Sequence, residues 1–277
     1  MQSFVRPQRL AASSHLLPAV SRWGRGFVVG LALAIAPMVM PVQGLAQSAA
    51  TAPTALKETL SQLDAAASKA DKTGVMKFYS PTFRHSDGLD RKGLEAALGK
   101  LWERYPNLKY RTEIQDWKRE GDAIVTETIT YVTGSQKVGD RQYNLNSTLR
   151  SRQRIVNQQI VQQEVLSEQS KVTSGENPPS IRLVLPSKVK PGQRFNFDAI
   201  VEEPLEDDLL LGAAVEEAIR PEGFLTPAKI ELRPLNAGGI FKVGRAPNRG
   251  ENRWISAVVV RDDGITVITQ RLIVSDK

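Results

Sequence analysis

The stretch from Phe83 to Arg91 places two residue types of acid–base chemistry close together. Its sequence is FRHSDGLDR, in which His85 and Asp87 are separated by one serine. On an extended segment, residues i and i+2 point the same way, so the imidazole and the carboxylate could act as an oriented general base. The sequence Ser-Asp-Gly is also typical of a turn, in which the aspartate binds nearby backbone and Gly88 takes a positive φ. The turn is the favoured interpretation, and His85 and Asp87 are the candidate catalytic residues.

The supply of metal-binding side chains is small. The chain has two histidines, His15 and His85, and no cysteine. One imidazole cannot provide the two or three histidine ligands of an ordinary zinc site. The glycine-rich run 238–245 lacks the Gly-Lys-Ser/Thr ending of a phosphate loop. We therefore expect no metal site, no disulfide and no cofactor.

A second set of candidates lies on the expected strands and could line a pocket. Glu127 shares a strand face with Val125, Ile129 and Tyr131, which are core-like residues. An isolated buried carboxylate is strongly disfavoured, so Glu127 should be paired, lie in a polar pocket, or lie at the sheet edge. The candidate ligand-binding residues are Tyr110, Trp117, Glu127, Tyr131 and Arg152.

Arg152 belongs to a ladder of alternating arginines, Arg150, Arg152 and Arg154. In a strand these three side chains share one face. If that face lines a pocket, it could bind a carboxylate or a phosphate. Because Leu149 and Ile155 on the other face resemble a packed side, exposure of the arginines to solvent is favoured.

The first 46 residues have the pattern of a secretory signal. Four arginines precede the apolar run 27–42, and Gly44-Leu45-Ala46 provides a small-residue end, with cleavage expected after Ala46. The alternative is an uncleaved membrane anchor, because the uncharged stretch 26–46 approaches the roughly 20 residues that span a bilayer. Pro37 and Pro41 favour cleavage, after which no stable membrane span is expected.

The net charge excludes an obvious nucleic-acid partner. Without the four arginines of the signal, 33 of the 37 basic residues remain, against 30 acidic residues. Binding of nucleic acid would require a clustered basic face. We expect no nucleic-acid partner.

The composition divides the exported chain into two halves. Ser174-Gly175-Glu176-Asn177-Pro178-Pro179 can continue neither a helix nor a central strand, so 175–180 is the predicted linker. The predicted domains are 47–174 and 181–277.

The first half has helical and then strand periodicity. Leu56, Leu60, Leu63 and Ala67 predict a helix that ends at Thr73-Gly74, and Asp90 predicts the N-cap of a second helix. Ser80-Pro81 is expected to stop the segment between them. Four antiparallel strands should follow, beginning near 108, 124, 142 and 159. Helices followed by such strands indicate an α+β domain with helices on one face of the sheet.

The second half consists of short apolar or alternating runs separated by turn residues. The expected strands are 181–185, 194–201, 209–215, 229–235, 240–243, 254–261 and 266–274. This spacing is typical of a β-sandwich, immunoglobulin-like in a loose sense.

The first half resembles a known superfamily. The segments KFYSPTF (77–83) and LWERYP (101–106), with the four-stranded meander, resemble the nuclear transport factor 2-like superfamily, which includes ketosteroid isomerase and SnoaL-like cyclases. The resemblance implies a cone in which a curved sheet wraps helices around a pocket.

More narrowly, the exported chain resembles a cyanobacterial group that combines such a cone with a sandwich. This resemblance rests on SDGL (86–89), LRSRQR (149–154), EPLEDDLLLG (203–212) and GGIFKVGRAP (238–247). It implies a location in the periplasm or the thylakoid lumen.

Two functions are carried forward. The first is a non-catalytic binding or assembly protein, in which the cone binds a small apolar or anionic ligand or forms a homodimer, and the sandwich docks an envelope protein partner. The alternative is a lyase or isomerase, with His85 or Asp87 as the base and Tyr110 or Tyr131 as the oxyanion donor.

Overall fold

The structure is a computed structural model that describes residues 46–276, apart from 205–208, 226–229, 236–237 and 263. The predicted signal, except for Ala46, lies outside the described residues. The described chain is mostly β, with a large and mainly antiparallel sheet. Within the described ranges, no helix has both the length and the apolar character needed to cross a membrane.

In the part of the chain that the structure describes, three α-helices precede the long strands: α1 (Thr54–Ala67), α2 (Lys72–Met76) and α3 (Arg91–Arg104). The predicted end of the first helix at Thr73-Gly74 was wrong, because α1 ends at Ala67 and Asp71 begins a new helix by accepting a hydrogen bond from the Gly74 N–H. The predicted cap of the next helix is confirmed. The Asp90 carboxylate accepts a hydrogen bond of 2.8 Å from the Gly93 N–H.

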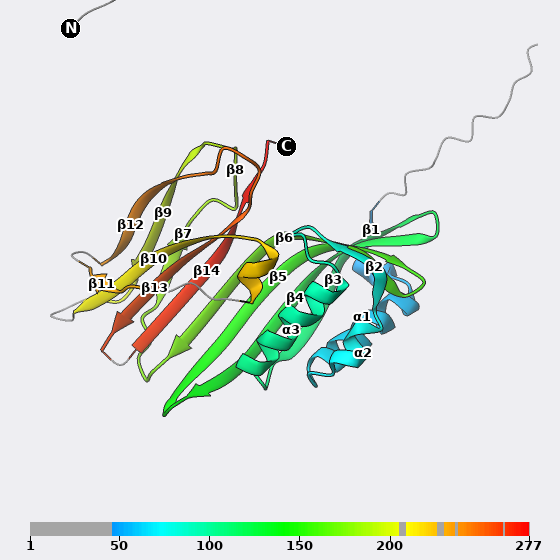
Figure 1. The fold of residues 1–277 in the computed structure, drawn as a ribbon, viewed down its shortest axis with the longest axis horizontal. Coiled ribbons are helices and arrows are strands. Elements are labelled where there is room, and N and C mark those ends of the chain that lie inside the picture. Colours follow the sequence, from blue (N-terminus) through cyan, green and yellow to red (C-terminus); the bar gives the residue numbers. More distant parts are fainter. Residues whose placement is uncertain (1–45, 205–208, 226–229, 236–237, 263, 277) are drawn as a thin grey trace, which may run out of the picture. The chain divides into compact units, whose positions relative to one another are not determined.

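Four long strands form the predicted antiparallel meander. They are β3 (Lys109–Glu120), β4 (Ala123–Val138), β5 (Arg141–Val156) and β6 (Gln159–Ser174). The helices lie over one face of this part of the sheet (Figure 1).

Two further strands of the first half were not predicted. β1 (Gln47–Ser48) pairs with β3, and β2 (Tyr79–His85) pairs in parallel with β6. The expected stop at Ser80-Pro81 was wrong, since β2 continues through the proline. Its pairing with β6 shifts register between Tyr79 and Arg84, and a proline is tolerated in such an irregular strand at a sheet edge.

The second half contains eight strands and one short 3₁₀ helix, η2 (Pro221–Phe224), in its described residues. The strands are β7 (Ile181–Val184), β8 (Lys188–Val189), β9 (Arg194–Val201), β10 (Leu210–Ala218), β11 (Arg233–Pro234), β12 (Gly239–Arg245), β13 (Arg253–Arg261) and β14 (Gly264–Val274). Three of them form a separate sheet in the order β12-β9-β7.

The other main strands of the second half extend the sheet of the first half. Residues 265–270 of β14 pair antiparallel with residues 169–174 of β6. The resulting sheet follows the order β1-β3-β4-β5-β6-β14-β13-β10-β11. The strand pattern of the sequence did not predict this pairing, which brings residues of both halves to one face.

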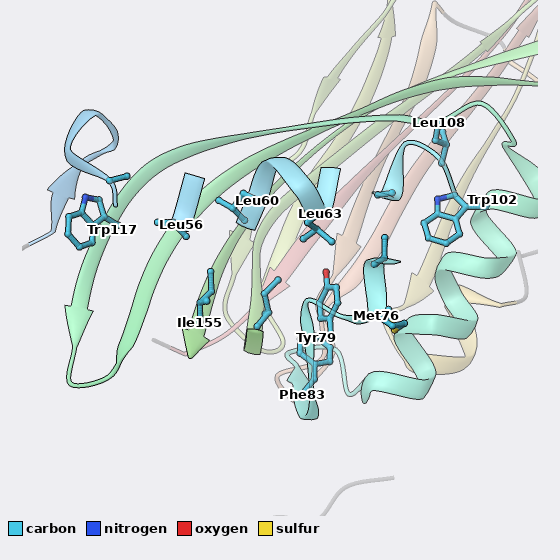
Figure 2. Packing of buried hydrophobic residues seen from close by; sticks show 14 of the residues in the cluster. Leu56, Leu60, Leu63, Met76, Tyr79, Phe83, Trp102, Leu108, Trp117 and Ile155 are labelled. Carbon is cyan, nitrogen blue, oxygen red and sulfur yellow. The ribbon is translucent and has the colours of Figure 1, made fainter. Parts of the chain in front are cut away.

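Each half has its own apolar cluster. In the first, the leucines of α1 face Ile155 and Tyr79, with Trp102 of α3 at one end and Trp117 of β3 at the other (Figure 2). In the second, the two sheets contribute jointly, with Phe195 and Phe197 from β9 and Ala257 and Val259 from β13. Burial of these side chains from water is the main stabilising contribution in both halves.

Candidate functional site

A cavity of about 390 Å³ lies between helices α1 and α3 and the inner face of β3–β6. Most of its wall is apolar. The apolar lining includes Leu60, Leu63, Leu94, Ala97, Leu98, Leu101, Val132, Leu149 and Val165. The second half of the chain contributes Phe224, Trp254 and Arg271, so the cavity is built from both halves.

A buried ionic cluster forms one part of the wall. The Arg271 guanidinium donates two hydrogen bonds of 2.8 Å, one to each carboxylate oxygen of Asp87. Its Nε and Nη2 also donate to Oε2 of Glu168, at 3.1 and 2.9 Å. The side chains of Arg271 and Asp87 are 1% and 2% exposed. Such a bidentate, charge-assisted pair fixes the orientation of both groups.

The surroundings of Arg271 hold its positive charge. Burial alone would lower the pKa of the guanidinium, but the hydrogen bonds to Asp87 and the negative charges of Glu168 and Asp87 outweigh this effect and raise the pKa. Glu168 also accepts a hydrogen bond of 3.0 Å from the indole of Trp254. Arg271 is therefore a fixed cation whose three nitrogens all point to carboxylates.

Asp87 is held in place by the turn that its sequence favours. The Gly88 N–H donates to the His85 carbonyl, and Gly88 has a φ of +84°, a conformation that glycine adopts without strain. The Ser86 hydroxyl accepts a hydrogen bond from the Val165 N–H of β6 at 3.2 Å. The turn is thus fastened to the sheet beside the cavity.

His85 lines the cavity but is not oriented by the carboxylate. Its Nδ1 accepts a hydrogen bond of 3.2 Å from the Asp87 N–H, and the nearest Asp87 oxygen lies 3.5 Å from the same nitrogen. This arrangement requires an unprotonated Nδ1 and leaves the proton on Nε2. Burial lowers the pKa of His85, although the charge of Asp87 opposes the shift, so the neutral imidazole is favoured. The imidazole then presents a donor, not a base, through Nε2.

His85, Gln163 and Gln153 form a row of polar residues across strands β2, β6 and β5, and both glutamines are buried. Gln163 of β6 pairs in register with His85 of β2 on one side and with Gln153 of β5 on the other. Both glutamines line the cavity, and neither Oε1 atom has a hydrogen-bond partner among the described residues.

The opposite end of the cavity carries Asp64 and Tyr110. The carboxylate of Asp64 accepts hydrogen bonds from the Thr112 N–H and hydroxyl, at 2.6 and 2.8 Å. Burial raises the pKa of Asp64 despite these bonds. Tyr110 accepts a hydrogen bond of 3.0 Å from the Trp102 indole, and burial raises its pKa to about 12. The Tyr110 hydroxyl therefore stays protonated at neutral pH.

The cavity brings together three of the predicted site residues, His85, Asp87 and Tyr110. Trp117 does not line the cavity but belongs to the apolar cluster of the first half, and its indole N–H donates a hydrogen bond of 3.3 Å to the Thr51 hydroxyl. A register shift between Ile114 and Asp116 turns Trp117 to the same sheet face as Tyr110, which strict alternation had not predicted.

The other predicted ligand-binding residues lie on the outer face of the sheet. Arg152 donates to Glu127 at 2.6 Å, and the guanidinium of Arg111 lies 4.3 Å from the ring centre of Tyr131. Glu127 thus obtains its partners from the arginine ladder, and with Arg152 it lines a polar hollow on this outer face. The predicted exposure of the arginines agrees with this placement, since the side chain of Arg152 is 46% exposed.

Sequence reasoning missed the residues that the second half contributes and the two glutamines. A signal exists for Arg271, which stands alone as a cation among the apolar residues of its strand. No local pattern marks Gln153 and Gln163, because polar residues are frequent throughout β5 and β6. Among the described residues, no group of three or more histidine, aspartate or glutamate side chains could hold a metal ion.

Comparison with known proteins finds one sequence family. Residues 176–275 match a family described as "Domain of unknown function (DUF8623)". No curated protein matches the sequence.

Several solved structures are similar to part of the chain. Bd1075 of Bdellovibrio bacteriovorus is 14% identical with a TM-score of 0.30, and the match covers 40% of this chain and 39% of that one. A hypothetical protein of ketosteroid isomerase-like fold from Catenulispora acidiphila is also 14% identical, with a TM-score of 0.30 and coverage of 39% and 83%. An LEH-like epoxide hydrolase of M. tuberculosis is 11% identical, with a TM-score of 0.28 and coverage of 40% and 80%. The resemblance to an exported cyanobacterial group stays a prediction.

Proposed function

We propose that the protein binds a small, mainly apolar ligand in the cavity without transforming it. The observation that carries the proposal is the cavity itself, which combines apolar walls with a few fixed polar groups. Its volume of about 390 Å³ lies within the roughly 300–1,000 Å³ that is usual for ligand pockets. A cavity of this size can hold a molecule with one aromatic ring or a larger apolar body.

The state of His85 and Asp87 supports binding over catalysis. A general base needs a free lone pair directed at the substrate proton. The lone pair on Nδ1 of His85 is occupied by the Asp87 N–H, and both oxygens of Asp87 accept from Arg271. Tyr131, one of the two expected oxyanion donors, lies on the outer face of the sheet beside Arg111. These contacts favour binding over proton abstraction by His85 or Asp87, and they leave Tyr110 as the one expected oxyanion donor in the cavity.

The finer description of the fold belongs to the same proposal. Helices α1 and α3 over the inner face of β3–β6 support a cone of the nuclear transport factor 2-like kind, and the shared apolar cluster of the two second-half sheets supports a sandwich. The pattern of the first 46 residues supports export to a periplasm or thylakoid lumen. N-terminal sequencing of the protein purified from a fractionated cell tests this location, and a mature chain that begins at Gln47 is the expected result.

Filling the cavity tests the proposed function. Ala97 lines the cavity on α3, whereas the adjacent Ala96 is exposed. We expect the wild-type protein to bind 2-phenylethanol, and Ala97→Trp to weaken this binding at least roughly tenfold because the indole occupies the ligand volume. Binding is measured by isothermal titration calorimetry.

Ala96→Trp is the matched control, since it adds the same side chain to the solvent side of the same helix. Its affinity should stay close to that of the wild type, and thermal unfolding should show that both variants are folded. Equal loss of binding in the two variants, or unchanged binding in Ala97→Trp, would place the ligand elsewhere.

A further inference from the structure

We propose that the polar end of the ligand is a protonated primary amine, held by the side-chain carbonyl oxygens of Gln153 and Gln163. The inference rests on the proposed function, because it names the chemical class of ligand that the same cavity takes. It is carried by two observations, the unpaired acceptors in the wall and the excess of negative charge around them.

The two glutamines provide adjacent acceptors that the chain itself does not use. Gln153 and Gln163 are 5% and 8% exposed, and they line the cavity. Neither Oε1 atom has a partner among the described residues. A buried acceptor without a partner is unfavourable, and donors supplied by a ligand would satisfy both oxygens.

Because the strand pairing places the two acceptors side by side, one ligand group must donate two hydrogen bonds to satisfy both. Gln153 and Gln163 are direct partners on β5 and β6. The Cα atoms of such antiparallel partners lie about 4.5–5.5 Å apart, so two neighbouring amides can reach one ligand atom. A hydroxyl group has one donor hydrogen and can satisfy one carbonyl. An ammonium group has three and can satisfy both.

The charges that line the cavity favour a cation. Among the described residues of its wall, the carboxyl groups are Asp64, Asp87 and Glu168, and the one guanidinium is Arg271. Even if Asp64 is protonated, two carboxylates face one guanidinium. His85, the next residue in the polar row, adds no positive charge while it is neutral. A cationic head therefore reduces an excess of negative charge in a wall that is shielded from water.

The sequence also allowed an anionic ligand. An anionic head group would find no free cationic side chain in the described wall of this cavity. Nε, Nη1 and Nη2 of Arg271 all donate to Asp87 or Glu168. Arg150 and Arg152 lie on the outer face, where both bind Glu127. A carboxylate or phosphate would enter next to Asp87 and Glu168 without a free cation to receive it.

Matched probes that share a phenylethyl body test the head group. Isothermal titration calorimetry of the full-length mature protein compares 2-phenylethylamine, 2-phenylethanol and 3-phenylpropanoate. We expect the amine to bind roughly tenfold more tightly than the alcohol, a difference of about 1.4 kcal/mol, and the carboxylate to bind most weakly. The trimethylammonium analogue, which has the charge but no N–H donor, should bind more weakly than the primary amine.

Variants of the two glutamines test the contact. In the double variant Gln153→Met and Gln163→Met, the preference for the amine over the alcohol should fall to less than about threefold, while binding of the alcohol persists. Gln162→Met is the matched control, because Gln162 is exposed and adjacent in the same strand. Its preference should equal that of the wild type.

The outcomes separate this inference from the function on which it rests. If none of the probes binds, the proposed function fails, and the inference fails with it. If the alcohol binds as tightly as the amine, or if the double variant keeps the preference for the amine, ligand binding stands and the inference is overturned. If the trimethylammonium analogue equals the primary amine, charge alone selects the ligand and the assigned hydrogen bonds are wrong.

Discussion

At the scale of single residues, Arg271 is the group on which the buried cluster depends. Its removal in Arg271→Met leaves Asp87 and Glu168 without their cation in a buried position. Breaking a buried ion pair from one side costs about 3–5 kcal/mol, and we expect a loss of this size in the free energy of unfolding. Urea denaturation measures this loss, provided that the slope of the unfolding free energy against urea concentration is the same in both proteins.

Arg154→Met is the control for this experiment. Arg154 also binds a carboxylate, that of Glu120, but both side chains are 38% exposed. Because solvent screens an exposed pair, its loss should lower the free energy of unfolding far less than the loss of the buried pair. Similar losses in the two arginine variants would mean that the cluster around Arg271 is not buried in solution.

The buried imidazole of His85 predicts how the stability of the protein depends on pH. Burial lowers the pKa of His85 below its ordinary value of 6.5, with the charge of Asp87 acting in the opposite direction. The unfolded chain therefore binds the proton more readily, so stability is fully present above pH 6.5 and is lost as the pH falls through it. Between about pH 7.5 and 5.5, the wild type should lose more stability than His85→Gln, as measured by urea denaturation. If both proteins lose the same amount of stability, His85 has the same pKa in the folded and the unfolded chain, and the prediction is wrong.

At the scale of elements, α3 depends on the cap that its sequence predicts. Asp90 satisfies the Gly93 N–H at the start of the helix, and α3 forms one wall of the cavity. Asp90→Ala should lower the free energy of unfolding by about 1 kcal/mol. Asp90→Ser, which keeps a capping oxygen, should stay within about 0.5 kcal/mol of the wild type. Chemical denaturation of both variants decides whether the side chain acts as a cap.

At the scale of the whole molecule, the pairing of β6 with β14 predicts that the two halves unfold together. Val259 lies in the cluster of the second half and is 0% exposed, so Val259→Ala should cost about 2 kcal/mol. If the shared sheet couples the halves, the most protected amides of β5 and β13 should lose the same amount of protection. Native-state hydrogen exchange measures both strands in one experiment.

Val243→Ala is the control for this coupling, because Val243 on β12 is 58% exposed and its truncation removes little buried surface. It should leave both strands unchanged. A loss of protection in β13 alone after Val259→Ala would support two independent domains, as the linker at 175–180 had suggested.

Features that depend on residues close in the chain were predictable. The helical spacing of Leu56, Leu60 and Leu63, the cap at Asp90 and the four long strands all appear in the structure. The errors are also local, at Thr73-Gly74 and Pro81, where a new cap and an irregular strand edge replaced the expected ends.

The sequence by itself determined the periodicity of each element and which of its residues are apolar, because caps, turns and alternation act over a few residues. Tertiary structure alone decided which side chains share the cavity. Asp87 and Arg271 are 184 residues apart and meet because β14 pairs with β6. The register shift near Ile114 likewise decided which face Trp117 takes. Pairing and register depend on contacts between distant strands, which no local pattern specifies.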